Sequence, residues 1–100
     1  MIIYNVTVNV EDSVHDDWLQ WMKEVHIPDV MSTGCFVENR FARVLIEEES
    51  GRTYSIQYLA KGMDSLQDYQ DNFAAKLQRE HLDRYQNKFV AFRTLLELVG

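Results

Sequence analysis

Three histidines and one cysteine are the side chains of this sequence best suited to acid–base, nucleophilic or metal chemistry. His26 lies in the stretch WMKEVHIPDVMSTGCF, two residues before Pro28 and at the predicted end of a helix. The helix dipole favours a charged imidazole at that end, and an imidazole can serve as a general acid or base. Alternatively, His26 only caps the last carbonyl groups of the helix. On the first of these two interpretations, His26 is the candidate catalytic residue.

The other reactive side chains have weaker patterns. His81 lies on the flank of the apolar stripe of a second predicted helix, where a histidine is commonly half-buried without a function. Cys35 would need a nearby base or positive charge to become a nucleophile, and a free cysteine at a strand start is usually a small buried hydrophobic residue. The spacing of His15, Asp12, Asp16 and Asp17 matches no metal motif. We expect no metal site, and the sequence has no nucleotide-binding fingerprint or serine elbow.

The elements that must position these residues follow from hydrophobic periodicity. Residues 2–10 alternate with period two, which predicts a strand. Asp12 and Ser13 can cap the following helix. The helix has one apolar stripe, formed by Val14, Trp18, Trp21, Met22 and Val25. We expect that helix to end by Ile27, because a proline disfavours helical geometry in the residue before it. A short turn, PDVMS, then ends at Gly34.

The second half of the chain has three strands and a helix. Residues 36–46 are rich in strand formers, but their alternation is imperfect, so either a bulge shifts the register or both faces are covered. The segment EEESGR is a turn, and residues 53–60 alternate cleanly. A helix is predicted over 64–84 and a last strand over 89–99. The tryptophans Trp18 and Trp21 and the tyrosines Tyr54 and Tyr58 are expected between helices and sheet.

The resulting order, βαββαβ, predicts a ferredoxin-like α+β fold for residues 1–100 as a single domain. Right-handed crossovers place both helices on one face of a four-stranded antiparallel sheet. The first and third strands are then central, and the second and fourth are edges.

The sheet face without helices is predicted to be largely polar. It would carry Asn5, Thr7, Asn9, Thr53, Ser55, Gln57, Arg93 and Glu97, with Ile3, Phe41, Leu59 and Leu95 among them. Such a face is either simply solvated or covered by the sheet of a second copy, which would enclose a polar cavity. The candidate ligand-binding residues are therefore Asn5, Thr7, Ser55, Gln57, Arg93 and Trp21.

Charge and composition narrow the partners. The formal net charge is −6, so nucleic acid and anionic membrane surfaces are unfavourable partners. The single cysteine argues for a reducing compartment, and the start MIIYNVTVNV lacks the basic region of a signal peptide. No segment is apolar over enough residues to span a bilayer. We expect a cytoplasmic protein.

The first helix and its exit resemble the dimeric α+β barrel superfamily. Its members carry a tryptophan in that helix, a His-x-Pro-like step, and a glycine and an aromatic residue at the start of the second strand. The matching residues here are Trp18 or Trp21, His26, Pro28, Gly34 and Phe36. Within the superfamily, the chain is most similar to an uncharacterised family, a domain of unknown function. The resemblance implies a homodimer formed through the sheet face.

The superfamily includes monooxygenases without cofactor, isomerases, dehalogenases and haem-degrading enzymes. In the haem-degrading members, a histidine late in the second helix binds iron and an asparagine lies on the first strand; His81 and Asn5 resemble that pair. Those enzymes also have a tryptophan near the start of the second helix, where this chain has Tyr69 and Phe73.

Three functions are compatible with these patterns. The first is a homodimeric protein that binds a small molecule beside the sheet and needs no cofactor. The second is a cofactor-independent monooxygenase- or isomerase-like enzyme with His26 as acid–base, in which Asn5, Gln57 or Arg93 orients an oxyanion or carboxylate. The third is a haem protein that uses His81.

Overall fold

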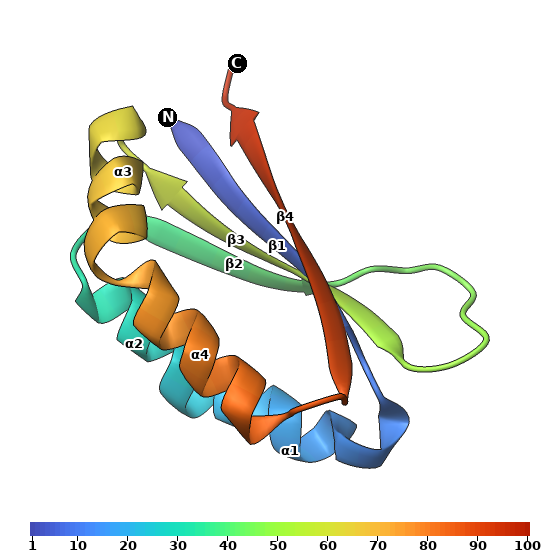
Figure 1. Ribbon diagram of the computed structural model, residues 1–100. Coiled ribbons are helices and arrows are strands. Elements are labelled where there is room, and N and C mark those ends of the chain that lie inside the picture. Colours follow the sequence, from blue (N-terminus) through green and yellow to red (C-terminus); the bar gives the residue numbers. More distant parts are fainter.

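The computed structural model describes residues 1–100 and contains one four-stranded antiparallel sheet (Figure 1). The strands are β1 (Ile2–Val10), β2 (Glu38–Arg43), β3 (Arg52–Ala60) and β4 (Phe89–Glu97), in the order β2-β3-β1-β4. β1 and β3 are central and β2 and β4 are edges, so the predicted ferredoxin-like topology is confirmed.

Two helical segments lie side by side and cover one face of the sheet (Figure 1). The first comprises the 3₁₀ turn η1 (Asp12–Val14), α1 (His15–Trp21), the π-helical turn η2 (Met22–His26) and α2 (Ile27–Ser32). The second comprises α3 (Met63–Asn72) and α4 (Ala74–Arg84), which meet at Phe73, where the backbone departs from helical geometry (φ −129°, ψ −34°). None of these helices combines the length and the hydrophobicity needed to span a membrane.

The prediction that the first helix ends by Ile27 is wrong, because the helix continues through Pro28 to Ser32. Proline lacks an N–H, and its ring clashes with the carbonyl four residues earlier in a regular α-helix. Here the preceding turn is widened: the N–H of Ile27 donates to the carbonyl of Met22, five residues back. This π turn makes room for the proline ring, and π turns are frequent at functional sites.

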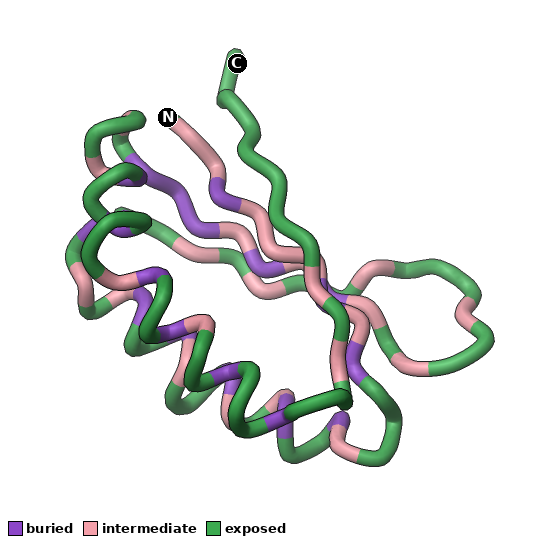
Figure 2. The backbone as a smooth tube through the Cα atoms, in the orientation of Figure 1, coloured by how far each residue is buried: buried purple, intermediate pink, exposed green.

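The core lies between the sheet and the helices. Its largest fully buried side chains are Trp18, Ile56, Leu66, Val8, Val10 and Val30. Buried positions follow β1, β3 and the sheet-facing sides of the helices, whereas β4 is mostly exposed (Figure 2). Trp18, Tyr54 and Tyr58 are buried as predicted, and Trp21 is half-buried at the edge of this core.

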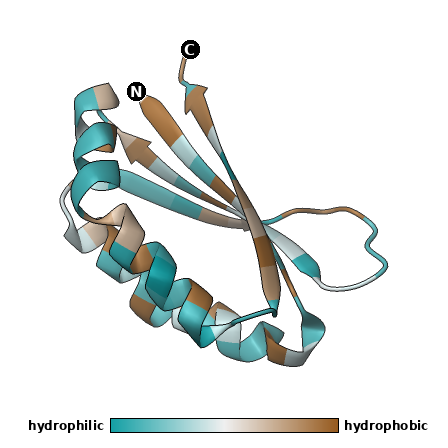
Figure 3. Cartoon of the chain, in the orientation of Figure 1, coloured by the Kyte–Doolittle hydropathy of each residue, from teal (hydrophilic) through white to brown (hydrophobic).

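The predicted faces of β4 are reversed in the structure. Arg93 pairs with Val6, and Leu95 pairs with Tyr4, so both lie on the helix side; Phe92 pairs with Thr7 on the open side. The more apolar set of β4, which includes Val90, Phe92 and Leu96, lies on the open face, where Phe92 is 63% exposed. Hydrophobic residues run along β4 and the connection after β2 (Figure 3).

The irregular alternation of residues 36–46 arises in part because its apolar residues lie on both sides of the sheet: Phe41 faces the helices, whereas Val44 and Ile46 line the hollow on the open face. Phe36 is buried but precedes the strand, and β2 itself starts at Glu38. Phe41 pairs with Ile56 and faces the helices, where its ring meets that of Trp18 edge-on, so its predicted place on the open face is also wrong. Phe36 and Phe41 both face the core although their positions differ in parity, so the change of parity occurs in the loop before β2.

Candidate functional site

The open face of the sheet holds a hollow of about 590 Å³ with a polar floor. The floor groups bond mainly to one another: the Ser55 hydroxyl donates to Asn5 Oδ1 (2.6 Å), and Asn5 Nδ2 donates to the Thr7 hydroxyl (3.1 Å). Gln57 also lines this hollow, and its walls are apolar: Val44, Ile46, Val90, Phe92 and Leu96. Mutually satisfied polar groups inside an apolar rim suit a packing surface better than a reactive centre.

A second, buried site lies on the opposite side of the sheet, beneath the helices. Its cavity measures about 20 Å³, room for roughly one water molecule. The polar lining residues are His26, His81, Arg93, Tyr4, Tyr58, Tyr69 and Gln78, and the apolar ones are Val6, Val8, Met22, Val30 and Ile56. We call this the His26 pocket. The structure thus unites His26, His81 and Arg93, and separates them from Asn5, Thr7, Ser55 and Gln57.

The π turn positions His26 in this pocket. Its ring stacks on Trp21, with 5.0 Å between ring centroids, and lies 5.3 Å from the ring of His81. Burial lowers the pKa of His26 to about 4; nearby Asp29 opposes this shift and Arg93 adds to it. The imidazole is therefore neutral at pH 7. Its Nδ1 atom is buried and has no hydrogen-bond partner in the chain.

His81 is fixed in one tautomer by Trp18. The indole N–H of Trp18 donates to His81 Nε2 (3.0 Å), so the proton of the neutral ring resides on Nδ1. The ring stacks on Phe89 at 4.0 Å between centroids, and burial lowers its pKa to about 3, with His26 and Arg93 adding to the shift. His81 therefore offers an N–H donor to its surroundings.

This arrangement does not fit haem. The Nε2 lone pair of His81 already accepts the indole N–H of Trp18 and is not free to bind iron, and Phe89 covers one face of the imidazole ring. A cavity of about 20 Å³ is also far smaller than a porphyrin. Asn5, the other residue of the haem resemblance, lies on the opposite sheet face.

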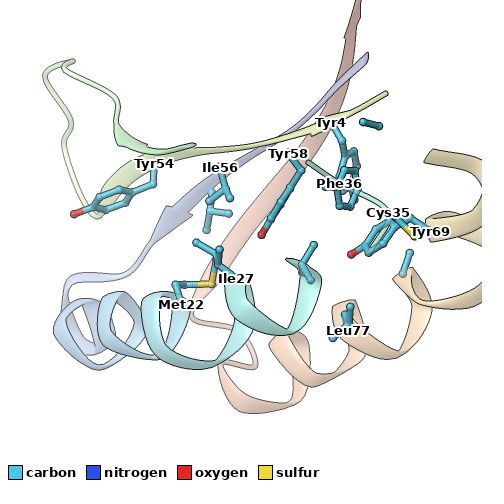
Figure 4. Packing of buried hydrophobic residues seen from close by; sticks show 14 of the residues in the cluster. Tyr4, Met22, Ile27, Cys35, Phe36, Tyr54, Ile56, Tyr58, Tyr69 and Leu77 are labelled. Atoms are coloured by element: carbon cyan, nitrogen blue, oxygen red, sulfur yellow. The ribbon is translucent and has the colours of Figure 1, made fainter. Parts of the chain in front are cut away.

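Three tyrosines, Tyr4, Tyr58 and Tyr69, complete the pocket, and none of them was among the predicted site residues. Burial raises the pKa of Tyr58 and of Tyr69 well above the usual value, so both hydroxyls stay protonated. Their rings extend into the space between the sheet and the helices (Figure 4). The Tyr4 hydroxyl accepts a long bond from Gln78 Nε2 (3.4 Å). A sequence signal existed: Tyr4 and Tyr58 share the helix-facing parity of the two central strands.

The family model described as Domain of unknown function (DUF4286) matches residues 1–99. The chain belongs to this family. Comparison with curated proteins gives no significant match. Solved structures share the fold at low sequence identity.

One such structure is HapK from Hahella chejuensis, at 10% identity and a TM-score of 0.73, with 100% of this chain and 94% of HapK covered. A second is a dimeric ferredoxin-like protein from an uncultured marine organism, at 14% identity and a TM-score of 0.72, covering 100% and 96%. A third is SnoaB from Streptomyces nogalater, a cofactor-independent oxygenase, at 9% identity and a TM-score of 0.69, covering 99% and 94%. The predicted superfamily resemblance is thereby confirmed at the level of fold.

The remaining candidates of this DUF4286 member have structural partners. The Cys35 thiol donates to Asp68 (3.4 Å), and burial raises its pKa, so it is not a thiolate. His15 lies 2.7 Å from the Tyr54 hydroxyl and 2.8 Å from Asp16, which satisfies both of its ring nitrogens. No group of three or more histidine, cysteine or acidic side chains is arranged to hold a metal ion.

Proposed function

We propose that this protein binds a small organic molecule in the His26 pocket and that His26 accepts or donates a proton there. The observation that carries the proposal is the buried Nδ1 atom of His26, which has no partner. A buried polar atom without a partner lowers the free energy of unfolding by about 1–3 kcal/mol, so its presence calls for a role that outweighs this cost. A neutral imidazole is a natural proton acceptor.

The neighbouring groups suit acid–base chemistry without a cofactor. As His26 takes a proton from a bound molecule, negative charge develops on that molecule. The Nδ1–H of His81 and the hydroxyls of Tyr58 and Tyr69 are protonated donors in the same pocket and can stabilise that charge. The same fold carries cofactor-independent chemistry in SnoaB, which is described as a cofactor-independent oxygenase.

Ligand entry requires a local opening. The cavity of about 20 Å³ is smaller than any organic ligand, so side chains at its rim must move outward. Arg93 is exposed and Gln78 is half-buried, and both can move without disturbing the core. The half-buried Trp21, stacked on His26, is a natural reporter of such a change.

The test is a titration of tryptophan fluorescence, to which Trp18 and Trp21 both contribute, with a defined panel: benzoate, salicylate, phenol and benzamide. We expect saturable binding of at least one compound, weakened tenfold or more by His26→Gln. The control Glu24→Gln lies on the same π turn, is exposed, and should bind within twofold of wild type. Equal binding by His26→Gln, or no saturable binding of any compound to wild type, would refute the proposal.

We also infer that two copies pair through their open sheet faces. Val90 and Phe92 are 69% and 63% exposed on that face, and they extend a continuous apolar rim with Val44 and Ile46. A patch of this kind is typical of an interface. The structurally similar protein from an uncultured marine organism is described as dimeric. A cytoplasmic location also agrees with the buried free thiol of Cys35.

The dimer is tested by substitution at the centre of the patch. Phe92→Asp places a carboxylate in the proposed interface but leaves the helix-side core untouched. Light scattering over a dilution series into the low micromolar range should give twice the chain mass for wild type and the chain mass for Phe92→Asp. The matched control is Arg79→Asp on the exposed side of α4, which should remain dimeric. A monomeric wild-type protein would overturn the inference.

A further inference from the structure

We propose that the ligand of the His26 pocket is an organic anion, a carboxylate or phenolate on an apolar body, whose charge is bound by Arg93. This inference rests on the proposed function of the same pocket and adds the chemical class of the ligand. It draws on three separate observations: the charges that line the pocket, the partners of Arg93, and the balance of hydrogen-bond donors and acceptors.

The pocket has a charge balance opposite to that of the protein. The chain carries a formal net charge of −6, yet no aspartate or glutamate lines the cavity. Arg93 is the one lining residue that is charged at neutral pH, because half-buried His26 and buried His81 are both neutral. Arg93 is exposed, so water screens part of its charge, but the apolar walls of the pocket keep water away on the side that faces the cavity. Asp29 does not line the cavity, but its charge acts on His26 more strongly than that of Arg93. The part of the pocket that favours an anion is therefore the part next to Arg93.

Arg93 has no acidic partner within the chain. Four of the other five arginines have an acidic partner: Arg40 pairs with Glu38, Arg52 with Asp12, Arg79 with Asp83, and Arg84 with Asp17. Arg43 also has no acidic partner, but it does not line the pocket. Arg93 takes part in no salt bridge or side-chain hydrogen bond, although acidic side chains outnumber basic ones in the sequence, 16 to 10. Its guanidinium thus presents all its donors to solvent and to the pocket.

The register of β4 explains why this cation faces the pocket. Arg93 pairs with Val6 and so projects toward the helices, whereas its neighbour Phe92 projects to the open face. β4 is an edge strand, and Arg93 is exposed there rather than buried under a helix. Its charge nevertheless lowers the pKa of both His26 and His81, so it lies within electrostatic reach of both rings. All three side chains line the same cavity, so a ligand that enters it comes within electrostatic reach of Arg93.

Donors exceed acceptors in this space. The guanidinium of Arg93, the Nδ1–H of His81 and the hydroxyls of Tyr58 and Tyr69 can donate, while neutral His26 supplies a ring nitrogen that can accept. A carboxylate or phenolate oxygen accepts several hydrogen bonds and pairs well with a guanidinium. The walls of Val6, Val8, Met22, Val30 and Ile56 would contact the rest of the molecule, which should be apolar.

The experiment compares benzoate and phenylacetate with their neutral amides, benzamide and phenylacetamide. Wild type is expected to bind the carboxylates at least tenfold more tightly than the amides in tryptophan fluorescence titrations. Arg93→Gln should remove this preference by weakening carboxylate binding tenfold or more, with little change for the amides. Arg93→Lys keeps the charge but not the planar guanidinium, so its affinity for the carboxylates should lie between those of wild type and Arg93→Gln. Arg79→Gln, on exposed α4, is the matched control and should behave as wild type.

The outcomes separate this inference from the proposed function. Amides that bind as tightly as carboxylates, or carboxylate affinity unchanged in Arg93→Gln, would overturn the anion assignment. If, in that case, His26→Gln still weakens the binding of these compounds, the proposed function of the pocket stands and only the anion assignment falls. If neither carboxylates nor amides bind wild type, and phenol also fails, both proposals fall. Because Arg93 is exposed, its variants should melt within a few degrees of wild type, which a thermal scan checks.

Discussion

Trp18→Ala is expected to lower the free energy of unfolding by about 3–5 kcal/mol, the range for truncation of a fully buried large aromatic side chain. The Trp18 side chain is 0% exposed, and its ring contacts those of Phe41 and Tyr54. The substitution also leaves Nε2 of His81 without its donor in a buried site, which adds to the loss. Urea unfolding followed by circular dichroism measures the change.

The control for this prediction is Trp18→Phe. It keeps an aromatic ring in the core but removes the indole N–H, so the loss should be smaller, about 1–3 kcal/mol. The difference between the two variants separates ring packing from the bond to His81. A Trp18→Ala protein within 1 kcal/mol of wild type would show that this ring does not anchor the helix layer on the sheet.

Acidification from pH 7 to pH 4 is expected to destabilise the protein through its buried histidines. In the unfolded chain His26 titrates near 6.5, whereas burial lowers its folded-state pKa to about 4. Between these values the unfolded state binds the proton and the folded state does not, so stability falls as pH falls. The full contribution is present above pH 6.5, and about 3 kcal/mol is lost by pH 4 from His26 alone.

Unfolding midpoints in urea at pH 7, 6, 5 and 4 check this expectation. His26→Leu removes the titrating ring and its unpartnered nitrogen, so its stability should depend less on pH in this window and should not fall at pH 7. Glu24→Gln, exposed on the same turn, should keep the wild-type slope. Glu11, whose pKa is lowered from 4.5 by its bonds to Ser13 and Lys88, begins to lose its contribution only at the acid end of this window. An equal slope in His26→Leu would contradict the assignment.

The binding of an anion and the protonation of His26 are expected to be linked. A bound carboxylate would offset the charge of Arg93, which now lowers the pKa of His26. The pKa of His26 should then rise in the complex, so that a proton is taken up on binding. This would convert a weak base in the free protein into a more effective proton acceptor when the ligand is present.

The sequence by itself determined the order of elements, the central strands and the nature of the core. Period-two alternation in residues 2–10 and 53–60 identified β1 and β3, because a strand with one buried face must alternate. Trp18 was identified as a core residue by its helical spacing. The sequence also indicated the family and identified His26 as a residue of interest, from the step before Pro28.

Only the tertiary structure decided which side chains share a pocket. On the edge strand β4 the apolar parity faces away from the helices, so alternation alone assigned Arg93 to the wrong face. Periodicity reports that one face is more apolar, but not which layer, helices or a second sheet, will cover it. The π turn before Pro28 and the meeting of Tyr58, Tyr69 and His81 around His26 depend on contacts between residues far apart in the sequence, and local pattern does not encode such contacts.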